Sequence, residues 1–114
     1  MSPSELAKIY MMSFFGKKPV EEMRPILMED LKFTGPFYKY STAEDYIQSL
    51  KENMPVDDVS YEILQEYENE NSCCLVYKSR KQGIDETMAQ LFEVNNNKIT
   101  RIRLIFDASK FLNK

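Results

Sequence analysis

The chain has 114 residues, of which 43% are hydrophobic and 29% are charged, and its formal net charge is −3. This length suits a single domain, which we expect to span residues 1–114. The acidic balance leaves no basic stripe of the kind that nucleic-acid-binding proteins carry, so no nucleic-acid partner is expected. Histidine is absent, which excludes Ser-His and Cys-His nucleophile pairs and His-containing zinc sites, and we expect neither a metal nor a cofactor.

The two cysteines, Cys73 and Cys74, are adjacent within an apolar stretch. Because neighbouring residues of a strand point to opposite faces, we expect two separate free thiols and no disulfide. Residues 1–19 lack the basic start and the unbroken apolar run of a signal peptide, and no window approaches the roughly 18 apolar residues of a membrane span. These features predict a cytoplasmic protein without a membrane segment.

Two helices are predicted at the start of the chain. Ser2 and Glu5 have the spacing of a capping box, and apolar residues then recur at helical spacing as far as Gly16. A second, short helix is predicted over residues 19–23, ahead of a proline.

A short strand is predicted over residues 31–35. It is followed by three aromatic residues: Phe37, Tyr38 and Tyr40. Ser41 and Glu44 again have capping-box spacing, and they predict a third helix over residues 42–53.

From residue 57 onward the hydrophobic period changes to two, which is the period of a strand. This alternation predicts strands near residues 59–63, 72–80, 88–94 and 101–106, and a last helical turn is expected over residues 109–112. Three helices followed by antiparallel strands are typical of the α+β class. We therefore expect a curved antiparallel sheet of four long strands plus a short one, with the helices packed on one face.

This order of elements, the step Gly35-Pro36 with the aromatics that follow it, and the last strand KITRIRLIFD resemble the SnoaL-like branch of the nuclear transport factor 2 superfamily. That superfamily also contains ketosteroid isomerase and scytalone dehydratase. The resemblance runs from about Ser4 to Phe111 and lies in the pattern of elements. It implies a cystatin-like cone, in which a bent sheet wraps around helices and leaves an apolar pocket at the open end, with Phe37 and Tyr40 at the rim.

The resemblance also bears on catalytic positions. Gly35 stands where the isomerase has its general base, and Leu104 stands where the polyketide cyclases have their catalytic aspartate. Tyr10 matches the isomerase's first hydrogen-bond donor to the reacting oxygen, and Gln90 takes the place of its second. Scytalone-dehydratase-like chemistry relies on histidine. The donors are therefore partly retained, the bases are not, and the known mechanisms do not transfer.

Four residues are candidates for catalytic roles, and each has a structural alternative. Tyr10 is either a pocket donor or a core aromatic with its hydroxyl at the helix edge. The amide of Gln90 lies on an apolar strand face and needs a partner, which is a ligand, a water or Tyr10 itself. Asp30 is either a base at the pocket mouth or a solvated loop carboxylate. Asp107 is either a site residue or the cap of the terminal turn.

We therefore expect a cone that binds a small hydrophobic molecule, with Tyr10 and Gln90 as its polar contacts and with any catalysis of the lyase or isomerase type. The other predicted lining residues are Phe33, Phe37, Tyr40, Tyr46, Met88, Phe92, Leu104 and Phe106. The alternative is a non-catalytic homodimeric interaction or structural protein whose cone is filled by its own side chains.

The opposite face of the predicted sheet carries apolar residues between charges: Ala89, Leu91, Arg101, Arg103 and Ile105. An apolar face of this kind is not expected to stay bare to water. It resembles the dimer surface common in this superfamily, and we expect a homodimer through it.

Overall fold

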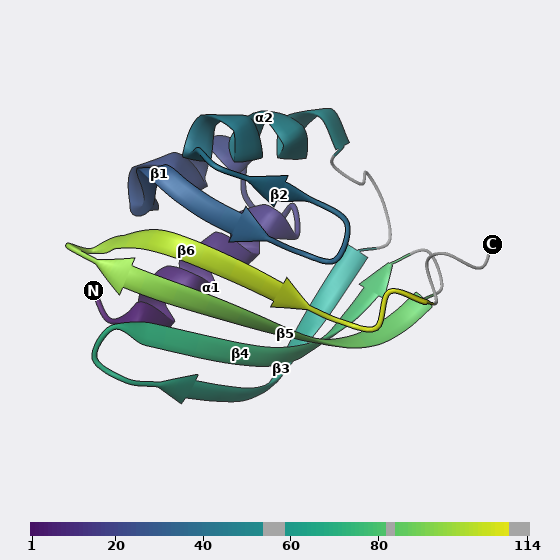
Figure 1. The fold of residues 1–114 in the computed structure, drawn as a ribbon. Helices are drawn as coiled ribbons and strands as arrows, with labels where there is room; N and C mark the ends of the chain where they lie inside the picture. Colours follow the sequence, from purple (N-terminus) through teal and green to yellow (C-terminus); the bar gives the residue numbers. More distant parts are fainter. Residues whose placement is uncertain (54–58, 82–83, 110–114) are drawn as a thin grey trace.

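The computed structural model describes residues 1–53, 59–81 and 84–109. Its elements are, in chain order, α1 (Pro3–Phe14), the 3-10 helix η1 (Val20–Ile26), β1 (Leu27–Thr34), β2 (Lys39–Tyr40), α2 (Ala43–Asn53), β3 (Val59–Glu68), β4 (Ser72–Lys81), β5 (Ile84–Asn95) and β6 (Lys98–Ile105). The strands form one six-stranded sheet in the order β2-β1-β6-β5-β4-β3. Figure 1 shows this sheet strongly curved, with α1 behind its long strands and α2 over β1 and β2. The predicted α+β class is confirmed.

The N-terminus of α1 is capped as the sequence predicts. The Ser2 hydroxyl accepts a hydrogen bond from the Glu5 N–H at 3.1 Å, and Glu5 Oε1 accepts one from the Ser2 N–H at 2.9 Å. After the helix ends at Phe14, Gly16 has a φ of 75°, in the left-handed region that glycine adopts without strain. The extent of α1 is therefore encoded locally.

Two carboxylates at the end of β3 fix α1 against the sheet. Glu68 Oε2 accepts a hydrogen bond from the Ser4 N–H at 2.8 Å, and Glu66 pairs with Lys8 at 2.8 Å. The first of these contacts satisfies an N–H group of the first helical turn, which has no partner inside the helix. Together they set the position of α1, and with it the direction in which Tyr10 points.

The start of α2 differs from the prediction by one residue. Thr42, and not Ser41, is the capping residue, because its Oγ1 accepts a hydrogen bond from the Asp45 N–H at 3.1 Å. Glu44 consequently forms no capping box and instead pairs with Arg24 of η1. The predicted capping box at Ser41 is wrong, although the helix itself is present.

The elements around β1 also extend beyond the prediction. The second helix is a 3-10 helix that continues to Ile26 with Pro25 inside it, and β1 begins at Leu27 and not at residue 31. β1 pairs with β6 in parallel and with the two-residue β2 in antiparallel orientation. The sheet is therefore mixed and not wholly antiparallel as expected, because β1 runs parallel to the last strand of the chain.

The long strands alternate between an inner face, toward the helices, and an outer face. On β4, Cys73, Leu75 and Tyr77 are buried on the inner face, whereas Cys74 lies on the outer one and is only half-buried. Both cysteines are free, as the sequence predicts. Burial raises the pKa of the Cys73 thiol to about 11, so it stays protonated and unreactive at neutral pH.

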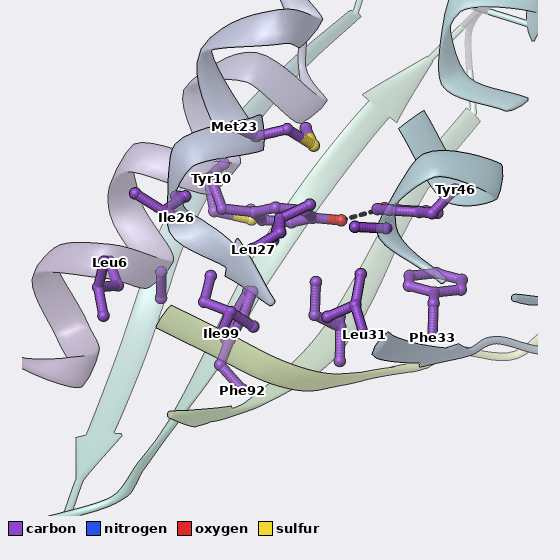
Figure 2. Packing of buried hydrophobic residues seen from close by; sticks show 14 of the residues in the cluster. Leu6, Tyr10, Met23, Ile26, Leu27, Leu31, Phe33, Tyr46, Phe92 and Ile99 are labelled. Atoms are coloured by element: carbon purple, nitrogen blue, oxygen red, sulfur yellow. Dashed lines mark hydrogen bonds between the residues drawn. The ribbon is translucent and has the colours of Figure 1, made fainter. Parts of the chain in front are cut away.

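The core fills the space between the inner face and the helices, and we call this space the cone. Leu6 and Tyr10 of α1 belong to this core together with Leu31 and Phe33 of β1, and Figure 2 shows the four side chains spread along it. Among the described residues, no helix is long and apolar enough to cross a membrane. The predicted terminal turn over residues 109–112 lies mostly outside the part of the chain that the structure describes.

Candidate functional site

Four buried polar side chains from four elements form one hydrogen-bonded network in the cone. Tyr77 of β4 donates to Gln90 Oε1 at 2.8 Å, and Gln90 Nε2 donates to the Tyr10 hydroxyl at 3.1 Å. The hydroxyls of Tyr10 and Tyr46 are hydrogen-bonded to each other. The tyrosines are at most 2% exposed and Gln90 is 0% exposed. We call these four residues the Tyr-Gln network.

The sheet register brings the network together. Tyr77 pairs with Met88 across β4 and β5, so its ring lies diagonally opposite Gln90 on the inner face. Tyr10 comes from the buried face of α1, where its ring meets Phe92 edge-on with the ring centroids 5.3 Å apart. Tyr46 comes from α2 on the far side of the cone. Figure 2 shows the hydroxyls of Tyr10 and Tyr46 pointing toward each other from the two helices.

The three tyrosines of the network are neutral hydrogen-bonding groups. Burial raises the pKa of Tyr10, of Tyr46 and of Tyr77 well above the ordinary value of 10.0, because the charged phenolate would lose its hydration. At neutral pH each hydroxyl therefore keeps its hydrogen, and none serves as a base.

A continuous row of aromatic rings leads from the protein surface to the network. Tyr38 is 64% exposed, and its ring is stacked on that of Tyr40 with centroids 6.3 Å apart. Tyr40 is half-buried, and its ring centroid lies 5.7 Å from that of Tyr46. The ring of Tyr46 also stacks on that of Phe33, with the centroids 4.5 Å apart. We call Tyr38, Tyr40 and Tyr46 the aromatic row. Tyr38 and Tyr40, two of the aromatic residues that the sequence places between β1 and α2, belong to this row.

The remaining predicted lining residues divide between the core and the rim. Phe92 is fully buried, and Met88 and Leu104 are half-buried against the core. Phe37 is 44% exposed and stands next to Phe106 with the ring centroids 5.8 Å apart. Phe37 therefore lies at the surface beside Phe106, whereas Phe92 is core, and the predicted rim at Phe37 and Tyr40 stays a prediction.

The carboxylate candidates lie apart from the network. Asp30 is exposed on β1. Asp107 is exposed and accepts a hydrogen bond from the Ser109 N–H at 3.0 Å, which is the capping alternative that the sequence allowed. Within the described residues, no group of three or more His, Cys, Asp or Glu side chains is placed to hold a metal ion.

Gly35 has no side chain and therefore cannot act as a base. A Cβ at this position would meet Cε1 of Phe33 at 3.3 Å and Cβ of Leu104 at 3.8 Å. A side chain there would therefore press on the ring that stacks against Tyr46. Glycine at this position therefore leaves room for the ring of Phe33.

The structure shows which protein groups Tyr10 and Gln90 contact, and a ligand contact of either residue stays a prediction. Tyr10 is both a core aromatic and a hydrogen-bond donor or acceptor, and Gln90 finds its partners in Tyr10 and Tyr77. Sequence reasoning did not single out Tyr77, because it lies in a continuous apolar stretch where no alternation distinguishes the faces. The signal that could have found Tyr77 is the predicted hairpin of β4 and β5, because pairing residues outward from its turn places Tyr77 on the same face as Gln90.

The outer face carries the other notable surface feature. In one row across the sheet, Tyr67, Cys74, Leu91 and Arg103 are paired neighbours, and these residues, with Arg101, line a hollow of about 900 Å³. In the next row Ala89 pairs with Ile105. Leu91 is 38% exposed and Ile105 is 50% exposed. All five residues predicted for the outer face lie on it.

Comparison with solved structures places this architecture among known folds. An NTF2-like protein of unknown function from Cytophaga hutchinsonii matches with a TM-score of 0.84 and 18% identity, over 99% of this chain and 96% of its own. The chain has the NTF2-like fold. The fold expected from the resemblance to SnoaL-like proteins is thereby confirmed. A scan against protein-family models and a search of curated proteins found no match.

Two further structures indicate how far this likeness reaches. A candidate SnoaL-like polyketide cyclase from Shewanella putrefaciens matches with a TM-score of 0.82 and 12% identity, over 97% of this chain and 83% of its own. A de novo designed protein with a curved β-sheet matches with a TM-score of 0.73 and 22% identity, over 98% of this chain and 94% of its own. Since a designed protein shares the fold, the fold by itself carries no function.

Proposed function

We propose that this protein binds a small, largely apolar molecule at the end of the cone where the aromatic row reaches the surface. The observation that carries the proposal is the row itself, which joins the exposed Tyr38 to the buried hydroxyls of Tyr46 and Tyr10. Aromatic walls with a few convergent polar groups are typical of small-molecule sites. Tyr40, half-buried between Tyr38 and Tyr46, is the side chain that would form an aromatic wall of the site.

Chemistry beyond binding is limited by the groups at hand. The tyrosines stay neutral, Asp30 and Asp107 are exposed, and Gly35 supplies no side chain. A hydroxyl of the network can polarise a carbonyl group, as isomerases and lyases of this fold are expected to do, but none of the candidate residues that the structure describes places a base beside it. We therefore place binding ahead of catalysis.

The test is a titration with the uncharged hydrophobic dye Nile red, followed by its fluorescence. Tyr40→Ala should weaken dye binding about tenfold, because the dye loses an aromatic wall of the site. Tyr67→Ala is the matched control, since Tyr67 is an exposed tyrosine on the outer face. If Tyr67→Ala or Leu91→Lys abolishes binding and Tyr40→Ala leaves it unchanged, the dye occupies the outer hollow and the proposal is wrong.

A second candidate function is homodimerisation through the outer face, with a cone filled by its own side chains. Its support is the apolar surface that Leu91 and Ile105 leave exposed in the single chain. Arg101, Arg103 and Glu93 share this face, so two copies related by a two-fold axis can bring opposite charges together. A second copy of this chain is therefore the occupant that the face fits.

Analytical ultracentrifugation tests the dimer. The wild-type chain should sediment as a dimer at micromolar concentration, and Leu91→Asp should shift it toward the monomer. Met12→Asp, an exposed change on α1, should have no effect. A monomeric wild-type chain would refute this second candidate and leave ligand binding unaffected.

A further inference from the structure

One row of paired residues on the outer face crosses all six strands of the sheet. Leu91 of β5 pairs with Arg103 of β6, and Arg103 pairs in turn with Thr34 of β1. From one edge of the sheet to the other, the row consists of Lys39, Thr34, Arg103, Leu91, Cys74 and Tyr67. We call these six residues the outer row. It is cationic on the side of β2 and β6 and largely apolar on the side of β5, β4 and β3.

The apolar part of the outer row lines the hollow on this face. Arg103, Leu91, Cys74 and Tyr67 all belong to its lining, and its volume of about 900 Å³ falls within the range of small-molecule sites. Neighbouring strands lie roughly 4.8 Å apart, so the backbones at Arg103 and Tyr67, three strands apart, are separated by roughly 14 Å. Beside the guanidinium group, the hollow therefore has room for a flat or extended molecule that covers about two strand spacings.

The charged side chains of the hollow leave one cation without a carboxylate. The charged residues in the lining are Glu68, Glu93, Arg101 and Arg103. Glu68 accepts a hydrogen bond from the Ser4 N–H of α1, and Glu93 pairs with Arg101 at 3.8 Å. Among the residues that the structure describes, none forms an ion pair with Arg103. The guanidinium group of Arg103 is therefore available to an anion from outside the chain.

The chemistry of the outer row indicates the kind of anion. The planar guanidinium group presents parallel N–H donors that match the two oxygens of a carboxylate, and it stays charged at neutral pH. On the apolar side, Leu91 is 38% exposed and Tyr67 is 58% exposed. An exposed tyrosine ring beside exposed aliphatic groups favours an aromatic or aliphatic body. A molecule that meets both parts of the row carries a carboxylate at one end and an apolar body at the other.

We propose that the outer row binds a small carboxylic acid in its ionised form, with the carboxylate on Arg103 and the apolar body across Leu91, Cys74 and Tyr67. This site is separate from the one at the aromatic row, which takes a largely apolar molecule. The acid would cover Leu91, which a second copy in the proposed dimer would also cover, so the two occupants exclude each other. The titrations are therefore run at chain concentrations at which ultracentrifugation shows the monomer.

Two probes of the same shape test the preference for charge: 2-naphthoate, which carries a carboxylate, and 2-naphthamide, which is uncharged. The wild-type chain should bind 2-naphthoate about tenfold more tightly, as expected for a charge-assisted bidentate contact that stays partly open to water. The preference should shrink at high salt, because dissolved ions screen an exposed contact. Calorimetry or naphthalene fluorescence measures the two affinities.

Arg103→Gln removes the charge and keeps most of the length of the side chain. It should abolish the preference for 2-naphthoate and leave the affinity for 2-naphthamide unchanged. Lys17→Gln is the matched control, because it removes one positive charge from an exposed position outside the hollow. Circular dichroism checks that both variants are folded. An unchanged preference in a folded Arg103→Gln chain would overturn the proposal.

Glu93→Gln should change the affinity in the opposite direction. It releases Arg101 from its ion pair and removes a negative charge from the lining, so the affinity for 2-naphthoate should rise about threefold. Glu22→Gln removes one negative charge from η1 and is the control, which should have no effect. An affinity that stays constant or falls in Glu93→Gln would contradict the arrangement of charges on which the proposal depends.

The position of the bound acid distinguishes the outer row from the cone. On addition of 2-naphthoate, the backbone amide signals of Cys74, Leu91 and Arg103 should shift in the nitrogen–proton correlation spectrum, whereas that of Tyr46 should not. Tyr40→Ala should leave the affinity for 2-naphthoate unchanged. Equal affinities for the two probes, or shifts confined to Tyr40 and Tyr46, would overturn this inference. Neither result would alter the outcome of the Nile red titration, which tests the proposed function separately.

Discussion

The inner and outer faces of β4 and β5 differ in how their side chains find partners. On the inner face the buried amide of Gln90 is satisfied within the chain, since it is bonded to both Tyr77 and Tyr10. On the outer face Leu91 of β5, and Ile105 of the neighbouring β6, remain exposed in the single chain. Neighbouring residues of one strand thus differ in their contacts. The inner ones pack in the core of the chain, and the outer ones are exposed in the single chain.

The largest expected effect comes from adjacent residues of β5 that point to opposite faces. Phe92→Ala should lower the free energy of unfolding by about 3–5 kcal/mol, because the ring is fully buried and leaves a cavity. Leu91→Ala, the neighbouring control, should change it by less than about 1 kcal/mol at concentrations where the chain is monomeric. Urea denaturation measures both, and similar losses for the two variants would contradict the assignment of faces.

Raising the pH should destabilise the inner face. Tyr10, Tyr46 and Tyr77 have raised pKa values in the folded chain, whereas in the unfolded chain they ionise near 10.0. The unfolded state therefore releases protons first, and stability is retained below pH 10 and falls above it, by about 1.4 kcal/mol per pH unit for each group that stays protonated.

The ultraviolet absorbance of tyrosinate, recorded beside circular dichroism, follows this titration. Of the seven tyrosines, these three should ionise only as the chain unfolds. Full ionisation of all tyrosines before any loss of circular dichroism would show that the network is open to water.

A smaller effect on the free energy of unfolding is expected when a single tyrosine hydroxyl is removed from either face. Tyr77→Phe should lower the free energy of unfolding by about 1–3 kcal/mol, because it leaves the buried Gln90 carbonyl without its donor. Tyr67→Phe on the outer face, where the ring is 58% exposed, should have an effect within about 0.5 kcal/mol. Thermal or urea unfolding of the pair separates them, and equal effects would argue against a closed network.

The smallest effect is expected at the outer end of the aromatic row. Tyr40→Ala should lower stability by about 1 kcal/mol or less, since Tyr40 is only half-buried. Tyr46→Ala, one ring further in, should cost about 3–5 kcal/mol. A loss of several kcal/mol at Tyr40 would make it a core residue and remove it as the entrance of the proposed site.

Local signals in the sequence predicted the elements that depend on near neighbours. The capping box of Ser2 and Glu5 located α1, and the change of hydrophobic period located the long strands and, on β5 and β6, their two faces. Thr42 replaced Ser41 as the cap of α2 because both residue types can fill that role, and only the backbone decides which one does. The sequence did not predict the early start of β1, because the strand that pairs with it is the last strand of the chain.

The candidate site was predictable in its residues but not in its connections. The resemblance to the isomerase singles out Tyr10 and Gln90, the apolar face of the third helix singles out Tyr46, and the amide of Gln90 needs a partner because it lies on an apolar face. Which group becomes that partner depends on four elements that meet across the cone, and no spacing along the chain contains that information. Tyr77 joined the network only because the register of β4 against β5 places its hydroxyl within 2.8 Å of Gln90 Oε1. Periodicity acts between residues a few positions apart and is written in the sequence, whereas a hydrogen bond between distant elements is decided by packing.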